Sequence, residues 1–238
     1  MDPSTLALTS RIIGDIGVVY GRGRVVAGTE AGQLKQQVKS MLADCNDIIL
    51  NFAGIDYIDS SGLGVLVTLC TRASAPNGQV VLCNLPEKVQ ELLTITKLTT
   101  VFEIYKTEAE AIYGLYGEVS RNLRPDAPTG PRLLCVDSST ELLAYLREIL
   151  RAENYPVLTA LNMEDALLLL RASKFSLVAI GPNFARQGAS TVEALRAAAG
   201  NAPLVTLRDN PDPAAMTREV VAQIGNALSS SMRASGPN

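Results

Sequence analysis

The 238-residue sequence contains no histidine, and this absence excludes several classes of chemistry. Without imidazole there is no serine–histidine triad and no histidine general base, and the commonest zinc ligand is missing. The four cysteines (Cys45, Cys70, Cys83 and Cys135) show no C-x-x-C spacing, which favours a role as buried apolar residues. The sequence therefore predicts no metal site and no cofactor, and it gives no indication of an enzyme.

Long apolar runs are also missing. No run approaches the roughly 20 residues that a helix needs to cross a bilayer. The segment Met1-Asp2-Pro3-Ser4-Thr5 lacks the basic region and apolar block of a secretory signal. With 47% hydrophobic and 19% charged residues, the composition is that of an ordinary globular protein. We therefore expect a cytoplasmic protein without a membrane partner.

A basic excess, which nucleic-acid binding usually requires, is missing as well. The net charge is −3, with −4 up to residue 120 and +1 beyond it. These values predict a protein partner and no nucleic acid.

Proline and glycine are concentrated at residues 122–131, where three prolines and one glycine fall within ten positions. Such a stretch continues neither a helix nor a sheet ladder and suits a short linker. We therefore expect one domain over residues 1–120, a linker over 121–131 and a second domain over 132–228. The small polar residues 229–238 predict a flexible tail.

Strand and helix patterns alternate in both predicted domains, which indicates an α/β class. In the first, a Gly14-Asp15 turn signal separates two β-rich runs, and Thr29 is expected to cap a helix. The strands are predicted at 6–13, 16–20, 48–52, 80–83 and 101–105, and the helices at 29–44, 63–71, 87–93 and 108–115. In the second, the strands are predicted at 133–136, 156–159, 177–180 and 203–206, and the helices around 142–150, at 163–171 and 192–199, and from an Asp212 cap to about 228.

One segment falls where a strand pattern ends and a helical pattern begins: Asp59-Ser60-Ser61-Gly62-Leu63-Gly64. These residue types alone allow an ordinary helix cap. They also suit a phosphate on Ser60, because a helix start favours negative charge. We expect Gly62 and Gly64 to let this helix pack closely on its neighbours.

With its flanking residues, this segment resembles the STAS family, in particular the bacterial anti-sigma factor antagonists. The resemblance covers about residues 4–117, is strongest over 51–64, and extends to 92–98 and 101–104. In that family a kinase that is also the anti-sigma factor phosphorylates the serine or threonine after the aspartate, and the phosphorylated form no longer binds it. The resemblance implies a partner-switching phosphoprotein that regulates sigma-factor-dependent transcription, with Ser60 as the phosphorylated residue and Ser61 as a secondary candidate.

The loop after the second strand departs from that family, in which many members carry an acidic residue there. Here Arg22 and Arg24 precede the first acid, Glu30. The arginines fit either a solvated turn or a change of partner. We expect the partner-binding residues to be Asp59, Ser60, Ser61, Gly62, Leu63, Arg24 and Glu30.

Residues 132–228 resemble, more weakly, the receiver domains of response regulators, which implies a flavodoxin-like fold. The residues that a receiver needs for phosphotransfer are largely missing: Asp137 is followed by Ser138, Gly181 stands where an aspartate would accept phosphate, and Thr206 alone matches a switch residue. Because these positions lack the carboxylates that hold Mg²⁺, we expect a shortened pseudo-receiver that serves docking or assembly.

Two functions therefore remain open at this point. The first is a phospho-switched anti-sigma factor antagonist. The alternative is a STAS scaffold subunit of a larger signalling complex that is assembled through the pseudo-receiver. Self-association of the chain is compatible with both.

Overall fold

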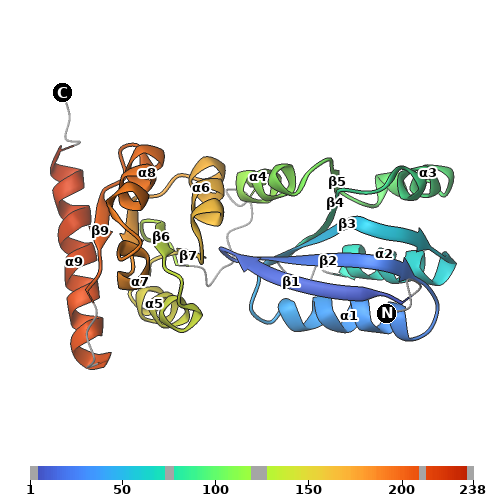
Figure 1. Cartoon of the computed structure of the whole chain (residues 1–238), viewed down its shortest axis with the longest axis horizontal. Helices are drawn as coiled ribbons and strands as arrows, with labels where there is room; N and C mark the ends of the chain where they lie inside the picture. The colour runs from blue at the N-terminus through green and yellow to red at the C-terminus, as the bar shows by residue number, and fades with distance from the viewer. Residues whose placement is uncertain (1–4, 73–77, 119–127, 209–212, 235–238) are drawn as a thin grey trace. The chain divides into compact units, whose positions relative to one another are not determined.

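Figure 1 shows the computed structural model, which describes residues 5–72, 78–118, 128–208 and 213–234. The chain divides into two units, Met1–Arg124 and Pro125–Asn238. Most of the expected linker, residues 121–127, lies outside the described residues.

The first unit is built on a sheet of order β1-β2-β3-β4-β5. Strands β1 and β2 form the expected antiparallel hairpin, and every other neighbouring pair is parallel. The strand bounds are β1 Ala7–Ile13, β2 Ile16–Val25, β3 Asp47–Ile58, β4 Val80–Cys83 and β5 Ile104–Tyr105.

Helices cover both faces of this sheet, with α1 and α2 on one side and α4 on the other (Figure 1). Leu34, Val38 and Met41 form the buried face of α1 and pack in the core with strand residues such as Leu50. Alternate residues of a strand point to opposite faces, so a sheet covered on both sides needs apolar residues at successive positions, as in β3. The helix bounds are α1 Thr29–Met41, α2 Ser60–Arg72, α3 Glu87–Ile95, the 3₁₀ helix η1 Leu98–Thr100 and α4 Glu108–Glu118.

Two local predictions for the first unit need correction. Thr29 is the first residue of α1 and does not cap it; Gly28 occupies the cap position at φ 109°, a left-handed conformation that suits glycine. The strand expected over 101–105 is confined to Ile104–Tyr105. The N–H of Val101 instead bonds to the carbonyl of Leu98, which closes the turn of η1.

The second unit has a parallel sheet of order β7-β6-β8-β9, which is consistent with a flavodoxin-like arrangement. Helices α5 and α9 share one core with the sheet, and α6 and α8 lie on the opposite face (Figure 1). The bounds are β6 Leu133–Val136, α5 Thr140–Ala152, β7 Val157–Ala160, α6 Met163–Ala172, β8 Leu177–Ile180, α7 Pro182–Ala185, α8 Ala189–Ala199, β9 Leu204–Thr206 and α9 Pro213–Ala234.

The last helix is longer than the sequence pattern suggested. Instead of ending near Leu228, α9 continues to Ala234 through the expected tail. The hydroxyls of Ser229 and Ser230 donate to the carbonyls of Gly225 and Asn226, at 2.8 and 2.9 Å. Serine that bonds back to the preceding turn is compatible with a helix, which explains the difference. The expected cap residue Asp212 and residues 235–238 lie outside the described residues.

The cysteines occupy interior positions, as predicted. Cys45, Cys83 and Cys135 are buried, Cys70 is partly buried, and all four are free thiols. Burial raises the pKa of Cys70, Cys83 and Cys135 to about 12. Neutral thiols of this kind are poor nucleophiles, which fits a packing role.

Candidate functional site

Asp59 joins the end of β3 to the start of α2 and also holds the loop that follows β2. Its Oδ1 accepts a hydrogen bond from the N–H of Gly62 at 2.8 Å, in the manner of a helix N-cap. Its Oδ2 accepts one from the N–H of Ala27 at 2.9 Å. One carboxylate therefore fixes the β2–α1 loop beside the first turn of α2.

The same contacts keep this carboxylate ionised. The hydrogen bonds from Gly62 and Ala27 are the main reasons why the pKa of Asp59 is lowered, and the charge of Arg24 adds to the effect. Both oxygens are engaged with backbone, so the structure gives Asp59 a positioning role for the residues around it.

Ser60 and Ser61 are the first two residues of α2, and both are exposed. The next two residues, Gly62 and Leu63, are buried beneath them. This arrangement presents two hydroxyls on a fixed backbone at the surface.

The two glycines of the segment differ. A Cβ on Gly62 would stand 2.3 Å from the carbonyl oxygen of Val25, so the expected close approach is confirmed there. Gly64 has no neighbour within 4 Å of such a Cβ, and the same expectation is wrong for it. Only the first glycine is required by packing.

Arg24 lies beside this segment, and its guanidinium stands 4.7 Å from the centre of the Tyr57 ring. Tyr57 is 49% exposed. Tyr57 is not predictable from the sequence, because its pairing with Arg24 depends on a strand register that cannot be read from residue types. Glu30 lies in the first turn of α1 and is partly buried.

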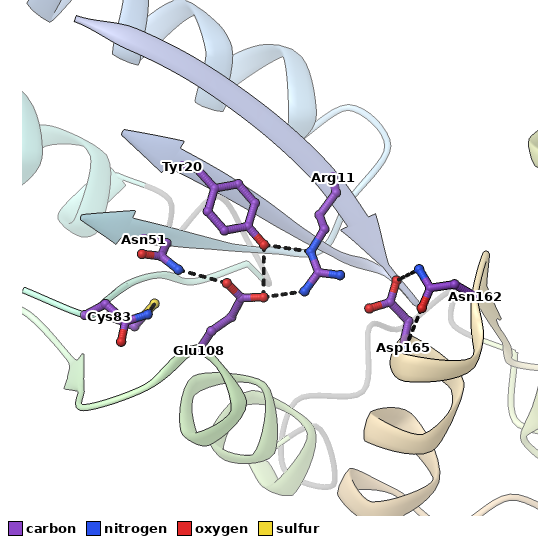
Figure 2. A network of polar contacts seen from close by, with 8 residues as sticks. Arg11, Tyr20, Asn51, Cys83, Glu108, Asn162 and Asp165 are labelled. Atoms are coloured by element: carbon purple, nitrogen blue, oxygen red, sulfur yellow. Dashed lines mark hydrogen bonds and ion pairs between the residues drawn. The ribbon is translucent and has the colours of Figure 1, made fainter. Parts of the chain in front are cut away.

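A separate polar network holds α4 to the sheet (Figure 2). Glu108 Oε1 accepts from the guanidinium of Arg11 at 2.5 Å and from the hydroxyl of Tyr20 at 3.0 Å. Its Oε2 accepts from the amide of Asn51 at 2.8 Å. Residue types do not predict this network, since its members come from three strands and a helix.

In the second unit, the carboxyl ends of β6 and β8 enclose the buried Asp137. Its Oδ1 accepts from the N–H of Ser139 and the side-chain amide of Asn183, at 2.8 and 2.9 Å. Its Oδ2 accepts from the N–H groups of Asn183 and Phe184, at 3.0 and 3.2 Å. The Asp137 carboxylate thus connects the start of α5 to α7.

The other receiver-like positions do not complete an acidic site. A Cβ on Gly181 would lie 2.2 Å from Asp137 Oδ2, so this carboxylate fills the space of a side chain there. Ser138 and Thr206 are exposed. Over the described ranges of the chain, no group of three or more Cys, Asp or Glu side chains is placed to hold a metal ion.

No helix within the described residues is long and apolar enough to cross a membrane.

Comparison with known proteins identifies the first unit. Residues 7–111 match the family model described as STAS domain. The predicted resemblance is thereby confirmed, and this part of the chain is a STAS domain.

Two curated relatives each align with about a third of this chain or less. A Thermotoga neapolitana protein, provisionally named an anti-sigma factor antagonist, is 35% identical over 72 residues, which are 30% of this chain and 64% of that protein. The anti-sigma F factor antagonist of Paenibacillus polymyxa is 29% identical over 68 residues, 29% of this chain and 58% of that protein. The chain thus spans less than two thirds of the length of these curated relatives.

Among solved structures, the unphosphorylated anti-sigma factor antagonist SpoIIAA aligns with 47% of this chain and 97% of its own, at 22% identity and a TM-score of 0.41.

Proposed function

We propose that the chain is an anti-sigma factor antagonist that binds an anti-sigma factor kinase through the start of α2 and is released by phosphorylation of Ser60. The observation that carries the proposal is the exposed position of Ser60 directly after the Asp59 cap. Curated relatives that are named as antagonists are 35% and 29% identical over 72 and 68 residues, and the STAS family model covers the segment that holds Ser60.

The cap explains why a phosphate here would act as a switch. Because Asp59 already bonds to the N–H of Gly62, that donor is not available to a phosphate on Ser60. The phosphate would add roughly −1.5 to −2 charges next to a carboxylate that is itself ionised. That charge would project from the surface into any interface formed over α2. A repulsion of a few kcal/mol there would weaken binding by orders of magnitude.

The test uses the full chain, ATP and each anti-sigma factor kinase encoded in the same genome. We expect mass spectrometry to find one phosphate on the wild type and on Ser61→Ala, and none on Ser60→Ala. Ser60→Asp should bind that kinase much more weakly than Ser60→Ala does. Labelling that persists in Ser60→Ala, or equal binding by the two Ser60 variants, would contradict the proposal.

The alternative, a scaffold subunit, is favoured by the second unit, a pseudo-receiver-like domain with a core of its own. Its buried Asp137 carboxylate is bonded to donors within the unit, which suits docking or assembly better than phosphotransfer. Light scattering on the full chain and on residues 1–120 tests this reading. The scaffold alternative is supported if the full chain forms a large assembly and the truncated chain does not. It is contradicted if both form equally small species.

A further inference from the structure

Two arginines of β2, Arg22 and Arg24, pair with residues of β3, the strand that leads to Ser60. A Cβ on Gly54 would stand 3.2 Å from Cβ and Cγ of Arg22, so the aliphatic stem of Arg22 lies over that glycine. Arg24 lies over the ring of Tyr57. All three side chains, Arg22, Arg24 and Tyr57, are exposed.

A bulge in β3 creates the contact between Arg24 and Tyr57. The register pairs Gly23 with Ile55 and then Arg24 with Tyr57, so that Asp56 is skipped. Without the bulge, Arg24 would face a carboxylate in place of an aromatic ring. A bulge that redirects a side chain is a common device beside functional sites. The cation–π contact holds the guanidinium in place while leaving its donors open to a partner.

The pair formed by Arg24 and Tyr57 lies next to the start of α2. The N–H of Asp59 donates to the carbonyl of Val25 at 3.2 Å, so the residue after Arg24 touches the residue before Ser60. Arg24 is also close enough for its charge to act on Asp59. We call the side chains of Arg22, Arg24 and Tyr57 the arginine surface.

We propose that the arginine surface selects the partner of this chain, by binding an acidic segment of the partner protein with its carboxylates facing Arg22 and Arg24. The inference rests on the proposed function and names the chemistry of the partner at the same site. Its basis is charge complementarity: within the described residues neither guanidinium forms an ion pair, so both are available to carboxylates from outside. We expect these carboxylates to come from a protein, since the net charge of −3 disfavours binding of a polyanion as large as nucleic acid.

The same surface gives phosphorylation a second effect. A phosphate on Ser60 would place a competing anion beside Arg24, and phosphate is a strong partner for guanidinium. It would weaken the attraction that the acidic segment depends on, in addition to repelling that segment directly.

The test is an NMR titration of the ¹⁵N-labelled full chain with hexaglutamate, which does not require the partner to be known. We expect salt-sensitive shifts centred on Arg22, Arg24, Tyr57 and Ser60, and binding at least about tenfold weaker for the Arg22→Glu/Arg24→Glu double variant. The matched control is Lys35→Glu/Lys39→Glu, which reverses two exposed cations on α1 and should bind like wild type.

Three outcomes would overturn the inference: no binding, equal weakening by the two double variants, or tighter binding of a thymidine hexanucleotide, which would indicate nucleic acid. The phosphorylation assay remains a separate readout. If no kinase phosphorylated Ser60 of the wild type while hexaglutamate bound as expected, the proposed function would be contradicted. If Ser60 were phosphorylated but the Arg22→Glu/Arg24→Glu variant bound hexaglutamate as the wild type does, only the inference of an acidic partner would be contradicted.

Discussion

Gly62 packs against Val25 so closely that a Cβ on the glycine would stand 2.3 Å from the carbonyl oxygen of Val25. That carbonyl also accepts a hydrogen bond from the N–H of Asp59. The end of β2 and the start of α2 are therefore in contact at both Asp59 and Gly62. The position of Ser60 at the surface follows from this contact, because backbone atoms cannot yield as a flexible side chain could.

A methyl group at position 62 should therefore disturb the site, whereas one at position 64 should not. We expect Gly62→Ala to lower the free energy of unfolding by about 1–3 kcal/mol, the usual cost of overpacking. Gly64→Ala adds a methyl group in open space within the same helix and should raise stability by up to about 1 kcal/mol. Urea unfolding checks both, and equal effects of the two changes would contradict this account of the contact.

The Asp59 cap should make stability depend on pH. Because the folded-state pKa of Asp59 is lowered, its contribution is present above the unfolded value of about 3.9 and is lost as the pH falls through the folded value. Asp59→Asn removes the charge and should abolish this part of the acid dependence. Unfolding of both proteins would be compared from pH 6 to pH 2. The control is Asp56→Asn, which removes an exposed carboxylate close by in the sequence; if it changed the curve as much as Asp59→Asn, the cap would not be the cause.

Much of the fold could be predicted from the sequence, because apolar residues recur at strand and helix spacing. The strands at 80–83, 133–136 and 177–180 were predicted at their observed bounds. The strand that leads into the site was not: β3 continues through residues 53–58, where its pattern is broken by bulges. Residue spacing carries no signal for a bulge, because a bulge depends on the partner strand.

The same limit applied to the site itself. Asp59, Ser60 and Gly62 are predictable from the sequence because a cap, a hydroxyl and a close approach each have a recognisable residue type. Tyr57 and the second hydrogen bond of Asp59, to Ala27, depend on chain segments that are distant in sequence. Such contacts follow from tertiary packing and become visible only in three dimensions.

The network around Glu108 should be visible in the titration of Tyr20. Burial, followed by the charge of Glu108, raises the pKa of Tyr20 to about 12. Glu108→Gln removes that charge and should lower the pKa of Tyr20, whereas Glu110→Gln on the exposed side of α4 should not. A raised tyrosine pKa stabilises the fold below the unfolded value of about 10 and ceases to do so as the pH rises through 12. NMR of ¹³C-labelled tyrosine measures the shift, and an unchanged value in Glu108→Gln would contradict the assignment.

In the second unit, Asp137 stands where the resemblance to receiver domains predicts an acidic residue, and its contacts are those of a structural residue. Four donors from Ser139, Asn183 and Phe184 converge on its buried carboxylate. Asp137→Ala would leave these donors without their acceptor, and each buried unsatisfied group costs about 1–3 kcal/mol.

We therefore expect Asp137→Ala to lower the stability of the second unit by about 3 kcal/mol or more, whereas Glu148→Ala on the exposed surface of α5 should have little effect. Hydrogen exchange followed by mass spectrometry separates the two units. Peptides from residues 132–208 should lose protection, and those from residues 5–72 should keep it. Unchanged protection in Asp137→Ala would mean that the carboxylate is dispensable for the fold, and a functional reason for a buried aspartate at the end of β6 would then have to be sought.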